Sequence, residues 1–437
     1  MVQTALFDWL RLSATRFYSE QARHNAPEIR ATLDASYLLV TLGLAVTTLA
    51  FALFGPELDF DGELILLALA TASVNGLFDY STALLRARFN DRLYSRLVFV
   101  KNLLALVLTG GGAFLFHSAG VAMAGSIAAL FGSVMTARAA LKDPGASVSA
   151  ARRETAGLLV GYSAPIISAH LLYQAIPLAA RSIVAHAYGF AETGQFSLAY
   201  DLGIRAVQAL GSALDVLLFQ IAVKTHDQHG ADRAKEQVAQ NMAVIVAFLL
   251  PACAGVWLVM PSIEALIVPA EFRGPFGHYL SLLLPGLFAF ALVMFGVNPV
   301  FQIAKKTSPL IGAAAVAIIS GFAFVVLLPW GTDASNLALA QCGAYVCALA
   351  ATLVFALRTR PIWPSFWDLF GAATATGIMV IVLQPLRAMT PGMVTLLLQV
   401  VAGGAIYGLM TLLFDIAGLR SLAFDWARPI LARRRPR

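Results

Sequence analysis

The sequence predicts an all-α protein that crosses a membrane about twelve times. Three observations predict this class. Hydrophobic residues make up 59% of the 437 residues and charged residues only 12%, which is about half the charged share of a soluble domain. The apolar residues gather in long stretches, each near or above the roughly 20 residues that a membrane span needs. The basic residues fall mainly in alternate connections between these stretches.

A short helix is expected to precede the spans. Met1–Tyr18 contains Trp, Arg and Tyr residues that are typical of an interfacial helix end or a cavity wall. The twelve expected spans cover approximately residues 35–54, 62–86, 94–116, 119–140, 156–185, 190–223, 241–268, 278–304, 308–329, 334–357, 366–388 and 393–417. We expect an N-terminal lobe over 1–155, a C-terminal lobe over 156–360, and two additional helices with a basic tail over 361–437.

The distribution of cations predicts the orientation of the spans. Of the 30 Lys and Arg residues, only two, Arg273 and Arg387, fall in expected connections on one side of the membrane. Four more lie within helices: Arg11, Arg16, Arg181 and Arg205. Because cytoplasmic connections carry the excess of cations, the C-terminus is expected to be cytoplasmic, with the tail Ala432–Arg437 on the anionic inner leaflet. This placement accounts for the pI of 9.3 without a nucleic-acid partner.

Polar residues form a stripe along each of the two central spans. In each span these residues recur at helical spacing, so they share one face of the helix. They are His170, Gln174, Pro177 and Arg181 in the first span, and Ser197, Asp201, Arg205, Gln208, Ser212 and Asp215 in the second. A cation near the middle of a span costs ~2.5–3.5 kcal/mol on insertion scales, so this face must contact protein or water.

Two interpretations of the stripes remain open. In the first, Asp201 and Arg205, four residues apart, neutralise each other as a structural pair. In the second, both stripes line a hydrated cationic cavity that takes an anionic cargo. The second interpretation also accounts for Arg181 on the neighbouring helix and for the continuation of the stripe to Asp215.

A faint internal repeat supports two lobes. Val74-Asn75 opens a polar face that ends in a basic connection, and Val297-Asn298 does the same six spans later. Equivalent placement in two six-span bundles is typical of a transporter built from parallel repeats. The residues on these faces are Asn75, Asp79, Thr82 and Arg86 in the first lobe, and Asn298, Gln302 and Lys305 in the second.

Catalytic and metal-binding signatures are absent from the sequence. It contains no HExxH, GxSxG, P-loop or CxxC motif, and Cys253, Cys342 and Cys347 lie in apolar spans without metal-like spacing. His170 is the only histidine well inside a span, and it is either a structural residue or a proton site. We therefore expect a protein that is not an enzyme and that has no metal or cofactor.

The run Ile183–Val223 carries a resemblance to a known family. Gly189, Gly194 and Phe196-Ser197-Leu198-Ala199-Tyr200 match a GxxxxGx(Y/F)SLAY segment. This segment resembles the middle of Wzx-type polysaccharide-export flippases of the multidrug/oligosaccharidyl-lipid/polysaccharide (MOP) superfamily. Trp9–Tyr18 resembles the end of that family's second helix, and Pro269–Arg273 resembles its connection between the ninth and tenth helices. The resemblance covers nearly the whole chain, and its motifs are loose.

The resemblance implies a fold and a function. The family fold has two pseudo-symmetric six-helix bundles around a central cavity, often with two extra C-terminal helices, and the match of Met1–Tyr18 implies that the first family helix is missing. The implied function is the transfer of a polyprenyl-pyrophosphate-linked oligosaccharide across the bacterial inner membrane by alternating access. The implied partners, besides this substrate and membrane lipids, are a polysaccharide polymerase, a chain-length regulator and glycosyltransferases.

Residues of the polar faces are candidates for this function, because Arg suits a pyrophosphate and amides suit sugar hydroxyls. The candidate substrate ligands are Arg205, Arg181, Gln174, Gln208, Arg11, Arg16, Asn75, Asn298 and Gln302, with Arg86 as a further cation. The candidate sites for a coupled proton or sodium ion are Asp79, Asp201, Asp215 and His170. The alternatives are a multidrug or cation antiporter of the same superfamily, an integral-membrane enzyme, and a polysaccharide-assembly protein without transport.

Overall fold

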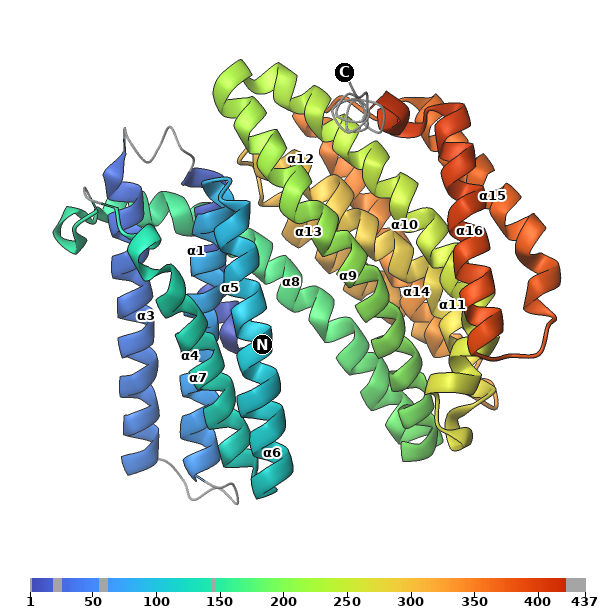
Figure 1. The fold of residues 1–437 in the computed structure, drawn as a ribbon, viewed down its shortest axis with the longest axis horizontal. Helices are drawn as coiled ribbons and strands as arrows, with labels where there is room; N and C mark the ends of the chain where they lie inside the picture. The colour runs from blue at the N-terminus through green and yellow to red at the C-terminus, as the bar shows by residue number, and fades with distance from the viewer. Residues whose placement is uncertain (1, 19–25, 55–61, 144–145, 422–437) are drawn as a thin grey trace, which may run out of the picture. The chain divides into compact units, whose positions relative to one another are not determined.

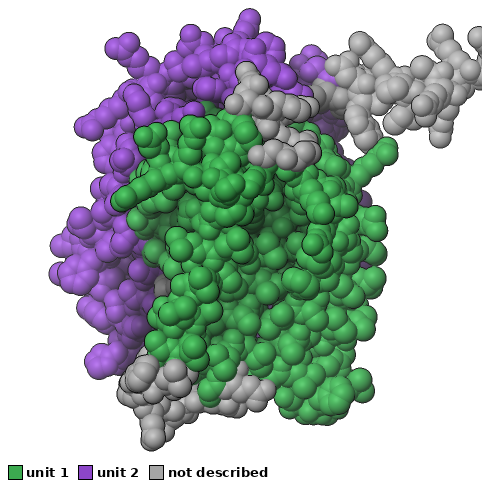
Figure 2. All heavy atoms as spheres, turned by 90° about the vertical axis from the view of Figure 1, so that its left-hand side faces the viewer, with its two compact units in different colours: residues 1–171 green, residues 172–437 purple. Residues whose placement is uncertain are grey.

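The structure, a computed structural model, describes residues 2–18, 26–54, 62–143 and 146–421. In these residues all regular elements are helices, and they form 12 continuous helical segments that are long and apolar enough to cross a membrane. The basic tail predicted to rest on the inner leaflet lies outside the described residues. The chain divides into two compact units, Met1–Leu171 and Leu172–Arg437, which Figure 2 distinguishes by colour.

Unit 1 is a helical bundle in which α4 packs on both α1 and α7 (Figure 1). The close contact of α1 and α4 depends on Gly76, where a Cβ atom would lie 2.5 Å from the ring of Phe7. The elements of this unit are α1 (Val2–Phe17), α3 (Pro27–Phe54), α4 (Gly62–Ala87), α5 (Asp91–Leu104), the π-helix η1 (Ala105–Gly110), α6 (Gly111–Phe116), α7 (Ala119–Leu141), η2 (Val148–Ala150) and the first half of α8 (Arg153–Tyr188).

A polar cluster joins the helix ends of unit 1. Arg88 donates to Asp143 at 2.9 Å and to the hydroxyl of Tyr18 at 2.8 Å, and the side chains of this ion pair are 9% and 8% exposed. The Tyr18 hydroxyl donates in turn to Asp143. Burial, together with this hydrogen bond, raises the pKa of Tyr18 to about 12, so the phenol keeps its proton at neutral pH. The cluster fixes the end of α1 to the ends of α4 and α7.

Unit 2 is built around α11, whose residues Phe276, Leu283 and Leu287 are at most 1% exposed. Helices α9, α10 and α14 pack against it. The elements are the second half of α8, α9 (Phe190–His229), α10 (Ala231–Ile267), η3 (Ala270–Phe272), α11 (Pro275–Ala291), the π-helix η4 (Leu292–Val297), α12 (Asn298–Ile303), α13 (Pro309–Leu327), α14 (Ser335–Ala356), η5 (Leu357–Thr359), α15 (Phe366–Arg387), α16 (Met393–Phe414) and η6 (Ile416–Gly418).

The last two spans belong to unit 2 and pack on α10 (Figure 1). Small buried residues let α15 approach, with Ala372 and Ala375 packed in one cluster with Ala243 and Ala247. The hydroxyl of Tyr407 on α16 donates to the carbonyl of Ala247 at 2.5 Å. Small residues at such contacts are typical of membrane helices, where close backbone approach replaces the hydrophobic driving force.

The predicted fold class and the twelve spans are confirmed. The helices extend beyond the predicted bounds at the basic connections. The segment 224–235, predicted as a connection, is helical except at Gly230, and α3 begins at Pro27 rather than near residue 35. Hydropathy locates the part of a helix that lies in lipid, whereas charged residues continue the same helix wherever it extends into water.

Candidate functional site

An ion pair joins the two central helices of unit 2. Arg181 on α8 donates to Asp201 on α9. The guanidinium lies over the ring of Tyr200, 5.5 Å from its centroid, and the Tyr200 hydroxyl lies 3.1 Å from that of Tyr345. Asp201 therefore neutralises Arg181 rather than Arg205, and the interpretation of Asp201 and Arg205 as a pair is wrong.

Arg205 lies one turn further along α9 on an exposed face. Gln208 and Ser212 follow it on the same face and are also exposed. Arg205 makes no ion pair, hydrogen bond or ring contact with any other residue that the structure describes. The structure therefore contains a solvent-accessible, unpaired guanidinium well inside a helix long and apolar enough to span a membrane.

Two glycines on the opposite face of α9 set this orientation. A Cβ at Gly203 would lie 2.6 Å from Leu280 on α11, and a Cβ at Gly211 would lie 2.3 Å from Phe295 in η4. These contacts hold the apolar side of α9 against the core of unit 2 and leave its polar stripe on the outside. On α8, Gln174 is exposed as well, whereas Tyr173 is buried against Phe290 with ring centroids 5.3 Å apart.

The two segments of unit 2 that carry the family resemblance meet at the start of α9. A Cβ at Gly194 would lie 3.1 Å from the ring of Phe272. Next to it, Gln195 donates to the carbonyl of Glu271 at 3.3 Å. Gly194 of the matched segment therefore has a packing role at this contact.

Unit 1 contains a second polar group, between α1 and α4. Gln3 donates to Asp79 at 2.9 Å and accepts a hydrogen bond from Asn75 at 2.7 Å. On α1, Arg11 lies 3.8 Å from Asp8. The structure thus brings together three of the predicted residues, Arg11 on one helix and Asn75 and Asp79 on the other, with Gln3, which sequence analysis missed. No local pattern marks Gln3, because its partners are more than 70 residues away.

Other predicted residues are buried. Arg16 is 3% exposed and Asn298 is 2% exposed, so neither reaches the surface in this conformation. The Oδ1 atom of Asn298 has no hydrogen-bond partner, and its amide nitrogen lies 4.0 Å from the sulfur of Met294. The remaining predicted residues, Arg86, His170, Asp215 and Gln302, are half-buried. The apparent repeat therefore places Asn75 in a hydrogen-bonded network and Asn298 in the core.

The described residues contain no group of three or more His, Cys, Asp or Glu side chains that could hold a metal ion. The two polar groups are chemically different. Unit 2 presents a cation with an amide and a hydroxyl beside it, which suits an anionic ligand that also carries hydroxyl groups. Unit 1 presents carboxylates within a hydrogen-bonded network, which suits the binding of a proton or a small cation.

No protein-family model and no curated protein sequence matches the chain. Solved structures do. An outward-facing multidrug resistance MATE family transporter of the MOP superfamily superposes with a TM-score of 0.65 and 14% identity over 82% of this chain and 84% of that chain. A mutant of the Vibrio cholerae MATE transporter VcmN superposes with a TM-score of 0.63 and 15% identity over 82% of this chain and 86% of that chain.

A third structure covers more of the chain. The lipid II flippase MurJ, in an inward closed conformation, superposes with a TM-score of 0.59 and 12% identity over 94% of this chain and 95% of that chain. The chain is therefore a multi-pass membrane protein with the fold shared by these MATE transporters and MurJ.

Proposed function

We propose that this protein carries a polyprenyl-pyrophosphate-linked oligosaccharide, such as the repeat unit of an O-antigen, an exopolysaccharide or a capsule, across the bacterial inner membrane by alternating access. The exposed, unpaired guanidinium of Arg205 in the middle of α9 carries this proposal. A pyrophosphate supplies the charge that such a cation requires, through charge-assisted and frequently bidentate hydrogen bonds.

The neighbours of Arg205 support a substrate that also bears hydroxyl groups. Gln208 and Ser212 on α9 and Gln174 on α8 are exposed polar residues within apolar helices. Amide and hydroxyl groups both donate and accept hydrogen bonds, as sugar hydroxyls do. In this proposal Arg205 binds the pyrophosphate, and the amides bind the first sugars. Arg181 has a smaller role because Asp201 already neutralises it.

The polar group of unit 1 supports coupling to an ion gradient. Asp79 accepts a hydrogen bond from Gln3, which is itself linked to Asn75. A carboxylate placed between α1 and α4 of a membrane protein is a default site for a proton or a cation. We propose that Asp79 binds the coupling ion, a proton or sodium. Asp201 is a weaker candidate because it is paired.

The structural similarities to the MATE transporters and to MurJ bear on the alternative function, antiport of organic cations. The two MATE structures described above superpose with slightly higher TM-scores than MurJ, and MurJ covers a larger share of both chains. The charge supports the glycolipid over the organic cation, because an unpaired Arg repels a cationic substrate. The lipid-linked glycan is therefore the better proposal.

The test is a comparison of two substrates with one preparation. Purified protein in liposomes would be assayed for translocation of a fluorescent polyprenyl-pyrophosphate oligosaccharide and for uptake of ethidium, each with an imposed proton or sodium gradient. We expect glycolipid translocation without ethidium uptake. Ethidium uptake alone would replace the proposal with antiport. Neither activity in a folded protein would support an assembly role without transport.

A further inference from the structure

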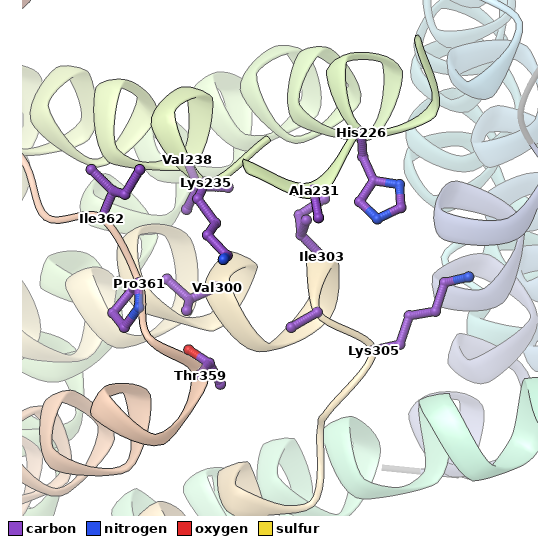
Figure 3. A pocket seen from close by; sticks show the side chains of 11 residues that line it. His226, Ala231, Lys235, Val238, Val300, Ile303, Lys305, Thr359, Pro361 and Ile362 are labelled. Carbon is purple, nitrogen blue, oxygen red and sulfur yellow. The ribbon is translucent and has the colours of Figure 1, made fainter. Parts of the chain in front are cut away.

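Unit 2 contains two pockets with different linings. One, of about 240 Å³, lies at the ends of α9, α10 and α12, and Figure 3 shows the ammonium group of Lys305 there pointing away from Lys235 and Thr359. The other, of about 160 Å³, lies between α8, α13 and α14, and we call it the α8–α13–α14 pocket. The described residues that line this second pocket include no Asp, Glu, Lys, Arg or His. It therefore suits an uncharged group.

The α8–α13–α14 pocket has small apolar walls and opens at the surface of unit 2. The small residues of its walls include Ala175 and Ala179 from α8, and Ala317 and Gly321 from α13. Ala179 is exposed, and so is the ring of Phe322, which lines the pocket from α13. The opening therefore lies between α8 and α13.

The surface around this opening is apolar. Helix α13 contains no charged residue. Ile319 and Val326, which lie on either side of Phe322 along the helix, are exposed as well. A helix that is apolar even on its exposed side is typical of a membrane span in contact with lipid. The pocket is therefore open to the hydrocarbon region of the bilayer.

One end of the pocket reaches a pair of aromatic rings. Val325 and Leu337 line both this pocket and a smaller concavity, which Trp330 and Tyr188 also line. The rings of Trp330 and Tyr188 stack with their centroids 6.3 Å apart, and Trp330 is exposed. Trp and Tyr residues gather at the head-group level of a bilayer. The pocket therefore extends from that level into the hydrocarbon region.

The pocket contains a buried amide without hydrogen bonds. Gln341 on α14 lines the pocket and is 3% exposed. Neither its Nε2 nor its Oε1 makes a hydrogen bond, and no other side chain that the structure describes has two buried polar atoms in this state. The hydroxyl of Tyr345, one turn along α14, could serve only one of these atoms and already lies 3.1 Å from the Tyr200 hydroxyl. Because buried amides are almost always hydrogen-bonded, Gln341 needs a further partner.

The position of Gln341 along α14 indicates which group that partner carries. Helix α14 begins at Ser335, so Gln341 lies about 9 Å along its axis. The interfacial layer on each side of a bilayer is roughly 5–8 Å thick. A lipid with its head group beside Trp330 therefore has its ester groups near the depth of Gln341. An ester carbonyl accepts hydrogen bonds, and the amide nitrogen of Gln341 donates them.

We propose that the α8–α13–α14 pocket binds an acyl chain of an ester-linked membrane phospholipid, whose ester carbonyl accepts a hydrogen bond from Nε2 of Gln341. The chain packs against the apolar walls, and the head group lies beside Trp330 and Tyr188. Bound lipid joins α8 to α13 and α14 and thereby stabilises this arrangement of unit 2. The proposal does not depend on which substrate the protein transports.

The experiment compares two lipids that differ only in the linkage of their chains. Protein purified in a neutral maltoside would be mixed with equal concentrations of dioleoylphosphatidylethanolamine and its dioleyl ether analogue, which lacks the ester carbonyls. Native mass spectrometry measures the ratio of the two bound lipids. We expect wild type to prefer the ester lipid about fivefold, the ratio that corresponds to one neutral hydrogen bond. Gln341→Leu should bind the two lipids equally.

Thermal unfolding without added lipid separates a binding role of Gln341 from a structural one. Gln341→Leu should unfold at or above the temperature of wild type, because it replaces an unsatisfied buried amide with an apolar side chain of similar size. A lower unfolding temperature, together with an unchanged lipid ratio, would assign Gln341 to the internal packing of unit 2 and overturn the proposal.

Matched variants separate this pocket from general lipid binding. Gln399→Leu removes another buried amide of unit 2 that does not line the pocket, so it should keep the ester preference. Ala179→Phe places a ring at the opening and should lose the bound lipid, whereas Leu178→Phe, at an exposed position outside the pocket, should retain it. Equal binding of the ester and ether lipids by wild type would contradict the proposal. Displacement of the ester lipid by a polyprenol would assign the pocket to an isoprenoid chain instead.

Discussion

Two arginines one helix apart show how neighbours decide the role of a residue. Arg181 lies in an ion pair and over an aromatic ring, so its charge is already compensated. Arg205 has no such partner among the described residues and lies on an exposed face. Helical spacing alone placed both in polar stripes. Only the three-dimensional pairing distinguishes a structural cation from one that is available to a ligand.

The ion pair makes a prediction about stability. Because the two side chains are 32% and 44% exposed, we expect Asp201→Ala to lower the free energy of unfolding by about 1 kcal/mol, between the values for surface and buried pairs. Arg181→Ala/Asp201→Ala should lose less than the sum of the single variants, because no charge is left unpaired. Denaturant unfolding in detergent measures this cycle. Strictly additive losses would show that the pair contributes nothing.

At the scale of the elements, periodicity and hydropathy predicted most of the fold. The predicted spans 366–388 and 393–417 correspond to α15 and α16 within a few residues. Hydropathy could not show that α9 continues to His229, because this extension is polar and outside the apolar window. Nor could it show the π-helix η4, which changes the backbone hydrogen bonding within a continuous apolar segment.

The candidate site was predictable only in part, because a sequence pattern reports on one helix and not on the contacts between helices. Helical spacing predicted that Arg205, Gln208 and Ser212 share a face, since they lie on one helix. The hydrogen bond between Gln3 and Asp79 and the pair of Arg181 and Asp201 join separate helices. Such contacts depend on how the helices pack against one another, and this packing cannot be read from the spacing of residues in a single sequence.

The connection between α8 and α9 allows a direct test of backbone geometry. It consists of Gly189 alone, with φ +89° and ψ 175°, a region that is essentially restricted to glycine. We expect Gly189→Ala to lower the free energy of unfolding by about 1–3 kcal/mol. Gly157→Ala is the control, because a Cβ there meets nothing within 4 Å and alanine favours a helix. Equal stability of the two variants would contradict this role for Gly189.

At the scale of the whole molecule, the charge distribution and the spans predict the topology. Connections near Lys306 should be cytoplasmic, and the connection after α13 should lie outside. In a background with Cys253, Cys342 and Cys347 replaced by Ala, we expect a membrane-impermeant maleimide to label Thr332→Cys in intact bacterial cells. Lys306→Cys should react only after permeabilisation. Labelling of Lys306→Cys in intact cells would reverse the orientation.

The fold shared with MurJ and the MATE transporters is compatible with several cargoes, so the cargo must be argued from the site. The account depends most on one residue: it requires that the unpaired guanidinium of Arg205 binds the pyrophosphate. If Arg205 did not contact the substrate, the case for an anionic substrate would lose its main support. The polar group of unit 1 would then support a coupling ion and no particular cargo.

The most direct measurement is therefore the rate of translocation of a polyprenyl-pyrophosphate oligosaccharide in proteoliposomes containing Arg205 variants. We predict that Arg205→Ala lowers the rate by about tenfold or more, because a hydrogen bond to a charged group contributes ~1.5–3 kcal/mol. Arg205→Lys should retain part of the rate, as a point charge without the bidentate geometry. Arg233→Ala, at an exposed helix end, should match wild type. A wild-type rate for correctly folded Arg205→Ala would contradict the account.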